Sequence, residues 1–181
     1  MKALISIDYT NDFIADDGAL TTGLAGQQIE SEMLKITESF IKNNQFIVLA
    51  IDAHVPTDEY HPENALFPPH NIVGTDGQQL FGDLHQLYQK IKNSTNVYWI
   101  NERHYSAFCG TDLDLRLRER HITEIHLIGV CTDICILHTA VDAYNLGYKI
   151  VIHQNAVASF DPIGHQWALK HFQNTLGATL I

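Results

Sequence analysis

Short apolar runs recur along this chain and alternate with helical patterns, and this alternation constrains the fold more than any other feature. Within the runs, apolar residues are consecutive, which is typical of strands buried on both faces of a sheet. Between the runs, apolar residues recur at helical spacing, as Met33, Ile36 and Phe40 do after the first run. The expected strands are residues 2–7, 46–51, 97–100, 125–130, 149–152 and 178–181. The expected helices are residues 28–43, 84–91, 113–117, 133–146 and 167–172, with a long loop over 52–79.

Strands that are buried on both faces and joined by helices require a parallel sheet covered on both sides. Right-handed crossovers then give a three-layer, doubly wound (Rossmann-like) α/β fold of about six mostly parallel strands. A length of 181 residues suits one such domain, spanning residues 1–181. In folds of this kind the ligand lies beyond the carboxyl ends of the strands, so candidate functional residues are expected there.

The charge balance and the cysteine count exclude some classes of protein. A net charge of −10 argues against nucleic acid and against an anionic membrane surface as the main partner. No apolar run approaches the length of a membrane span, and Asp8 interrupts the first run too early for a secretory signal. Three cysteines, at positions 109, 131 and 135, do not make a disulfide framework. We therefore expect a cytoplasmic protein with reduced thiols.

Several ionisable groups follow the expected strands directly. Asp8 follows the first strand, Asp52 the second, and Asn101 with Glu102 the third, while residues 131–135 follow the fourth and begin a helix. A single acidic residue after a strand is usually a turn or cap residue. Strand ends that deliver such groups together to one edge of the sheet indicate a functional site.

Cys135 is the candidate nucleophile at this edge. Thr132 suits the N-cap of the following helix and Asp133 its first turn, so Cys135 is expected near the positive end of that helix. This field lowers the pKa of a thiol and favours the reactive thiolate. Cys109 and Cys131 are interpreted as small apolar residues of the core. The spacing of Cys131 and Cys135 is also not the C-x-x-C of redox proteins.

A second group of polar residues lies in the long loop after the second strand. Asp52 and His54 are two residues apart in an extended segment, so their side chains point the same way and can share one ligand. Glu63 and His70 follow in the same loop, and His61 is an additional candidate. Histidine and carboxylate ligands suit Zn, Mn or Fe. Taken alone, the pattern fits a metal site and a polar loop equally well.

Five segments together resemble the nicotinamidases, the metal-containing branch of the isochorismatase-like cysteine hydrolases. These segments are IDYTNDF near the start, IDAH, HPENALFPPH, RHYSAFCGTDLDLRLRER and GVCTDICILHTAVDAYNLGY, and they run almost from end to end of the chain. The resemblance implies an isochorismatase-like hydrolase fold and hydrolysis of nicotinamide to nicotinic acid and ammonia, in NAD salvage. It also implies a homo-oligomer and a small pyridine carboxamide as substrate.

The resemblance assigns roles to individual residues. Cys135 would be the nucleophile that forms a thioester and Asp8 the general base, with the peptide between Val130 and Cys131 in the cis form. The backbone N–H groups of Cys131 and Cys135 would stabilise the oxyanion. The implied ligands of a divalent metal, zinc before manganese or iron, are Asp52, His54, Glu63 and His70. The implied aromatic walls around the pyridine ring are Phe13, Phe67 and Tyr105, which could equally be core residues.

One position departs from the family pattern. The family's third catalytic residue is a lysine just before the Y-S-A-F segment, and here that position holds Glu102. Arg103 is adjacent, but on an extended strand it points to the opposite face. A carboxylate opposes the thiolate that a lysine would stabilise, unless Glu102 is protonated and shares a proton with Asp8. The sequence leaves open an efficient nicotinamidase, a weakened homologue that binds a pyridine-like ligand, and a hydrolase of another small carboxamide. Isochorismate is not expected, because enzymes acting on that vinyl ether do not need this metal loop.

Overall fold

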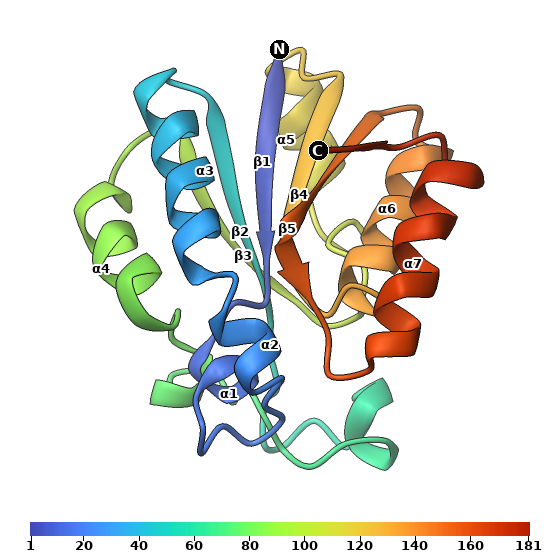
Figure 1. The fold of residues 1–181 in the computed structure, drawn as a ribbon. Coiled ribbons are helices and arrows are strands. Elements are labelled where there is room, and N and C mark those ends of the chain that lie inside the picture. The colour runs from blue at the N-terminus through green and yellow to red at the C-terminus, as the bar shows by residue number, and fades with distance from the viewer.

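The computed structural model describes residues 1–181 and has one central sheet of six strands in the order β3-β2-β1-β4-β5-β6. Every neighbouring pair of strands is parallel, as the apolar runs predict. Figure 1 shows the helices in two layers, with α3 and α4 on one face of the sheet and α5, α6 and α7 on the other. The predicted three-layer, doubly wound α/β fold is confirmed. The strands are β1 Lys2–Ile7, β2 Phe46–Asp52, β3 Val97–Glu102, β4 Glu124–Val130, β5 Lys149–Ala158 and β6 Thr179–Leu180.

The sheet is buried on both faces because its strands carry apolar residues at successive positions. On β1, Leu4 packs into the core under α3, while Ile5 and Ile7 pack into the core under α5, α6 and α7. The helices present apolar stripes to these cores, such as Met33 and Phe40 on α3. The α-helices are α1 Asn11–Ile14, α2 Leu24–Gln27, α3 Glu30–Lys42, α4 Gly82–Ile91, α5 Leu113–Glu119, α6 Cys135–Asn145 and α7 Pro162–Asn174. Two 3-10 turns, η1 Pro62–Ala65 and η2 Asp76–Gln78, interrupt the long loop after β2.

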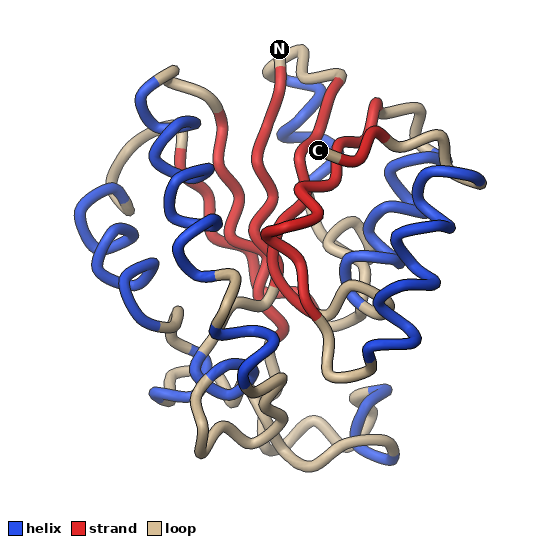
Figure 2. The backbone as a smooth tube through the Cα atoms, viewed as in Figure 1, coloured by secondary structure: helices blue, strands red, loops and turns tan.

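The strand order reverses between β1 and β4, so the chain winds outward from this point in both directions. In doubly wound sheets the crevice for a ligand opens at this reversal, beyond the carboxyl ends of the strands. Figure 2 shows that the chain at this end of the sheet consists mainly of loops and short helices. The fold therefore places the residues that follow β1 and β4 at the expected location of a site.

Two strand ends differ from the expected positions. β5 continues to Ala158 instead of ending at Ile152, because Val157 and Ala158 pair with Gly129 and Val130 after a register shift. The polar residues at 153–155 resemble a loop in the sequence, yet they lie within this strand. β3 continues to Glu102, which pairs with Asp52 at the end of β2. None of the helices is both long and apolar enough to cross a membrane.

Candidate active site

Asp8 lies directly after β1 and is fully buried. Its backbone adopts a φ of 54°, a left-handed conformation that costs a non-glycine residue about 1–3 kcal/mol and is most common at functional sites. Its Oδ1 accepts a hydrogen bond of 2.7 Å from the backbone N–H of Asp52, whereas Oδ2 has no partner with hydrogen-bond geometry. Burial raises the pKa of Asp8 well above its usual value, and the charge of Asp52 raises it further. A carboxyl group of this kind is a strong base that can take a proton from a neighbouring thiol.

Cys135 is the first residue of α6, which begins two residues later than expected, and it is buried. The carboxyl groups of Asp8 and Glu102 lie near its thiol. Burial raises the pKa of the Cys135 thiol well above its usual value, and the nearby Asp8 and Glu102 carboxyl groups raise it further. The prediction of a lowered thiol pKa was therefore wrong, because burial and like charge outweigh the helix terminus. The resting group is a thiol, and its activation requires the base beside it.

The segment before Cys135 carries the predicted cis peptide between Val130 and Cys131. The N-cap of α6 is Ile134, with no side-chain cap, so the expected N-cap role of Thr132 was wrong. The Thr132 side chain contacts His165 of α7 instead. No hydrogen bond within the chain occupies the backbone N–H groups of Cys131 and Cys135. Free N–H groups next to a buried thiol are the donors that an oxyanion requires.

Glu102 ends β3 opposite Asp52 and is 1% exposed. Neither of its carboxyl oxygens has a hydrogen-bond partner. Burial raises the pKa of Glu102 well above its usual value, and the charges of Asp8 and Asp52 raise it further. Arg103 does not compensate this carboxyl group, because its side chain points outward and binds Asp58 at 2.8 Å. In the family that this sequence resembles, a lysine occupies this position. Here the position holds a buried carboxyl group with no cation beside it.

This carboxyl group makes the stability of the fold depend on pH. Unfolded, Glu102 loses its proton near its usual pKa of 4.5, whereas in the fold it retains the proton to much higher pH. The folded state therefore binds more protons above this value, and we expect the free energy of unfolding to fall as pH rises. One proton contributes up to about 1.4 kcal/mol per pH unit. Urea unfolding between pH 5 and pH 8 with a chelator present should show a smaller fall for Glu102→Gln; identical slopes would contradict the buried proton.

Asn101, the neighbour of Glu102, does not contribute to the site. It is exposed, and its Oδ1 accepts a hydrogen bond of 2.8 Å from Nε1 of Trp99. Alternate residues of a strand point to opposite faces, so Asn101 points away from the groups that Glu102 faces. Of the polar residues expected at this edge, the structure brings together Asp8, Asp52, Glu102 and Cys135, but not Asn101.

The four predicted metal ligands form one buried cluster after β2. Their ligand atoms all lie within 4.8 Å of one another. Oδ2 of Asp52 lies 3.0 Å from Nε2 of His54 and 3.1 Å from Nε2 of His70, but these contacts lack hydrogen-bond geometry. Nδ1 of His70 contacts the carbonyl oxygen of Pro68 at 2.8 Å, which leaves Nε2 available as a ligand. The members are Asp52, His54, Glu63 and His70.

The charge of the cluster also suits a cation. Burial lowers the pKa of His70, but Asp52 and Glu63 outweigh burial and raise it to about 10. Two imidazoles and two carboxylates, with buried atoms that lack hydrogen-bond partners, match the ligand preferences of zinc and related divalent metals. The residues present therefore fit a divalent metal ion.

His61, the additional candidate, is not one of the four. Its Nδ1 accepts a hydrogen bond of 3.3 Å from the backbone N–H of Glu63, and its ring lies 3.8 Å from the ring of His54, centroid to centroid. His61 is thus the N-cap of η1 and supports the segment that carries Glu63.

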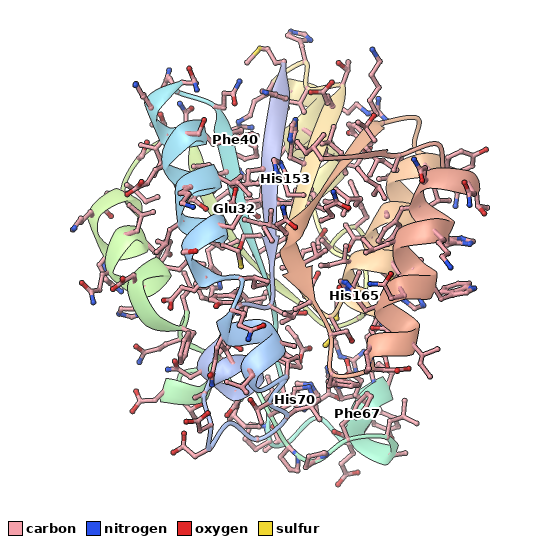
Figure 3. The ribbon with its side chains drawn as sticks, viewed as in Figure 1. Glu32, Phe40, Phe67, His70, His153 and His165 are labelled. Atoms are coloured by element: carbon pink, nitrogen blue, oxygen red, sulfur yellow. The ribbon has the colours of Figure 1, made fainter.

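The three predicted aromatic walls line one narrow pocket together with Cys131 and Cys135. The rings of Phe13 and Phe67 both meet the ring of His70 edge-on, at 5.3 and 6.2 Å between centroids. Figure 3 shows Phe67 and His70 close together beyond the carboxyl ends of the strands. Some lining residues were not predicted. One of them, Phe160, lies two residues after the end of β5, a position near the strand end only because that strand extends to Ala158. The pocket is lined by Phe13, Leu20, Glu63, Phe67, Tyr105, Cys131, Ile134, Cys135 and Phe160.

Comparison with known proteins agrees with this arrangement. The isochorismatase domain family matches residues 2–181. The isochorismatase family protein PncA of Bacillus subtilis (strain 168) is 60% identical over 177 residues, which cover 98% of this chain and 97% of that protein. The crystal structure of nicotinamidase/pyrazinamidase PncA from Bacillus subtilis has a TM-score of 0.98 at 59% identity, covering 99% of this chain and 98% of that chain.

Two further solved structures are similar over nearly the whole chain. The pyrazinamidase/nicotinamidase from Streptococcus mutans has a TM-score of 0.98 at 56% identity, covering 100% of both chains. The pyrazinamidase of Pyrococcus horikoshii in complex with zinc has a TM-score of 0.85 at 26% identity, covering 99% of this chain and 98% of that chain. The chain therefore belongs to the isochorismatase family and is a nicotinamidase-like amidohydrolase within it.

Proposed function

We propose that this chain hydrolyses nicotinamide to nicotinic acid and ammonia, with Cys135 as the nucleophile and a divalent metal ion bound nearby. One observation carries the proposal: the pocket with aromatic walls is bordered at once by the Cys135 thiol and by Glu63 of the metal-ligand cluster. A flat pyridine ring fits between aromatic side chains, and the thiol can then reach its carboxamide group.

The reaction proceeds in two stages. Asp8 takes the proton of the Cys135 thiol, and the sulfur attacks the carboxamide carbon. The backbone N–H groups of Cys131 and Cys135 stabilise the negative oxygen that forms. Asp8 then returns the proton to the leaving nitrogen, the C–N bond breaks, and ammonia departs, which leaves the thioester on Cys135. A water molecule that gives a proton to Asp8 attacks the thioester, which releases nicotinic acid and restores the thiol.

Asp52, His54, Glu63 and His70 would hold the metal ion. When bound, it supplies a Lewis-acid site for the ring nitrogen of the substrate. Zinc is the proposed ion, because the ligand set is nitrogen and oxygen in a buried cluster and because the Pyrococcus relative contains zinc. Manganese and iron are the alternatives.

We expect about one divalent metal ion per chain after loading with zinc. His70→Asn removes the imidazole with the least exposed side chain of the cluster and should lower metal affinity by about 10- to 100-fold or more. Elemental analysis after dialysis measures this loss directly. His121→Asn is the matched control, because His121 is an exposed histidine outside the cluster. Equal metal content in both variants would contradict the proposed ligand set.

The proposed substrate is tested by ammonia release from nicotinamide, with metal-loaded protein and a panel of other small carboxamides. Turnover of nicotinamide at the highest kcat/KM in the panel supports the proposal. Faster turnover of another carboxamide would identify a different amidohydrolase, and no turnover of any amide would contradict the proposed reaction. A cytoplasmic location, a role in NAD salvage and a homo-oligomeric state remain predictions.

A second function is favoured by Glu102. A buried carboxyl group without a cation, beside Asp8 and Cys135, opposes formation of a thiolate. The alternative is therefore a catalytically weakened homologue that retains the pocket and binds a pyridine-like ligand. Isothermal titration with nicotinamide distinguishes the two, because the weakened homologue binds the amide without consuming it.

A further inference from the structure

The segment between Cys131 and Cys135 is held by the first turn of α7. Thr132 is fully buried, and its backbone N–H donates a hydrogen bond of 2.9 Å to the carbonyl oxygen of Ala158 at the end of β5. Its side-chain oxygen lies 2.9 Å from Nδ1 of His165, and the two groups share a hydrogen bond. Figure 3 shows His165 on α7, above the pocket residues Phe67 and His70.

Asp133, the next residue of the segment, is held from the same side. Ser159 donates a hydrogen bond of 2.5 Å from its hydroxyl to Oδ1 of Asp133. A Cβ atom at Gly164 would lie 2.0 Å from Oδ2 of Asp133, so only glycine lets the carboxylate approach α7 this closely. Thr132 and Asp133 therefore both contact the start of α7 or the turn that leads into it.

The start of α7 is itself well defined. Asp161 is its N-cap, and its carboxylate accepts a hydrogen bond of 2.9 Å from the backbone N–H of Ile163. Pro162 occupies the first helical position, where its fixed φ suits a helix. His165 thus projects from a rigid support towards Thr132.

We propose that His165 is a positioning residue, which through Thr132 sets the backbone donors of Cys131 and Cys135 in place for the oxyanion. This proposal rests on the proposed cysteine amidohydrolase reaction. His165 does not line the pocket, and the one hydrogen bond of its side chain is to the residue that follows Cys131. Its effect is therefore on the carbonyl oxygen as charge develops there, and not on the nucleophile or on the ring of the substrate.

His165→Ala should lower kcat by about 10- to 100-fold with little change in KM, because small displacements of preorganised donors have effects of this size. His165→Asn places an amide near the position of Nδ1 and should recover most of the activity. His171→Ala is the matched control, since this histidine lies on the same helix and stacks on Trp167. A loss in His171→Ala equal to that in His165→Ala would show a general effect on α7 and overturn the proposal.

A double-mutant cycle tests the path through Thr132. Thr132→Val removes the hydroxyl group at nearly constant volume and should lower kcat by a similar factor. The double variant with His165→Ala should lose little more than either single variant, because both remove the same hydrogen bond. Multiplication of the two losses would contradict the proposal.

Alkylation of Cys135 by iodoacetamide separates the donors from the nucleophile. In this reaction the sulfur forms a bond to a saturated carbon and iodide leaves, so no oxyanion develops. The alkylation rate should be the same in wild type and His165→Ala while kcat differs. A parallel fall in both rates would mean that His165 acts on the thiol, which would overturn the proposed role.

Binding of pyridine-3-carbaldehyde keeps the test independent of turnover. Asp8 takes the proton of the Cys135 thiol and the sulfur adds to the aldehyde carbon, so the carbonyl oxygen becomes an oxyanion without any leaving group. His165→Ala should weaken this binding about as much as it lowers kcat. A wild type that binds the aldehyde but hydrolyses no amide contradicts the proposed function, and the aldehyde comparison still decides the role of His165. If the wild type neither binds the aldehyde nor hydrolyses an amide, both the proposed function and the proposed role of His165 are contradicted.

Discussion

Cys135→Ala should abolish ammonia release from nicotinamide, with a fall in kcat of at least about 10⁴-fold. The substitution removes the sulfur that would form the thioester, and no other group in the pocket can replace it. Cys131 also lines the pocket, but burial raises the pKa of its thiol, and the nearby Asp8 and Asp133 carboxyl groups raise it further. The fold should persist, because a small apolar side chain replaces a buried thiol of similar character.

Cys109→Ala is the matched control for this experiment. Cys109 was expected in the core, which was wrong: it is exposed and lies outside the pocket that contains Cys135, so its removal should leave kcat unchanged. Mass spectrometry after brief exposure to substrate should find an added nicotinoyl group on Cys135 in the wild type and none in Cys135→Ala. Activity of Cys135→Ala within tenfold of the wild type would contradict a covalent role for this residue.

Asp8 and Cys135 work as a pair in this proposal, because both have raised pKa values. A thiol that resists ionisation reacts slowly by itself, whereas a base with a raised pKa accepts its proton more readily. The burial that disfavours the resting thiolate therefore also strengthens the base. Proton transfer within the pair matters more here than a preformed thiolate at the helix terminus.

The sequence predicted the framework well because burial on two faces leaves a direct signal. Consecutive apolar residues such as those of β1 and β2 identify a parallel sheet, and the carboxyl-edge rule then locates Asp8, Asp52, Glu102 and Cys135. The metal-ligand cluster was predicted by resemblance and agrees with the observed geometry. The position of each polar residue relative to its strand is enough to predict this site, because the carboxyl ends of neighbouring parallel strands lie at one edge of the sheet.

The errors all concern tertiary contacts. Thr132 has the right chemistry for a cap, but His165, distant in the sequence, competes for its hydroxyl group. The thiol pKa depends on how deeply the aromatic pocket buries Cys135 and on which charges surround it, and local sequence contains neither. Phe160 was missed because polar residues within β5 resemble the end of a strand. Contacts between segments that are distant in the sequence therefore determine the cap of α6, the pKa of the Cys135 thiol and the length of β5.

Glu102→Lys should raise kcat/KM for nicotinamide by about tenfold or more. In the wild type, the buried Glu102 and Asp8 carboxyl groups both raise the pKa of the Cys135 thiol. A lysine ammonium at position 102 reverses the sign of one of these interactions, and each unit by which the thiol pKa falls corresponds to about 1.4 kcal/mol in favour of the thiolate. The pH dependence of iodoacetamide alkylation measures the thiol pKa independently of turnover, and its midpoint should move to lower pH.

Two further variants separate charge from other effects of the substitution. Glu102→Gln removes, at nearly constant shape, the carboxyl group that becomes negative when it loses its buried proton, and it brings no cation, so its thiol pKa and kcat/KM should fall between those of the wild type and Glu102→Lys. Glu38→Lys makes the same charge change on the exposed face of α3 and should leave both quantities unchanged. If Glu102→Lys instead matched the wild type in alkylation and turnover, the charge at position 102 would have no role. The wild type would then be an efficient enzyme without a cationic third residue, because Asp8 alone would suffice to activate Cys135.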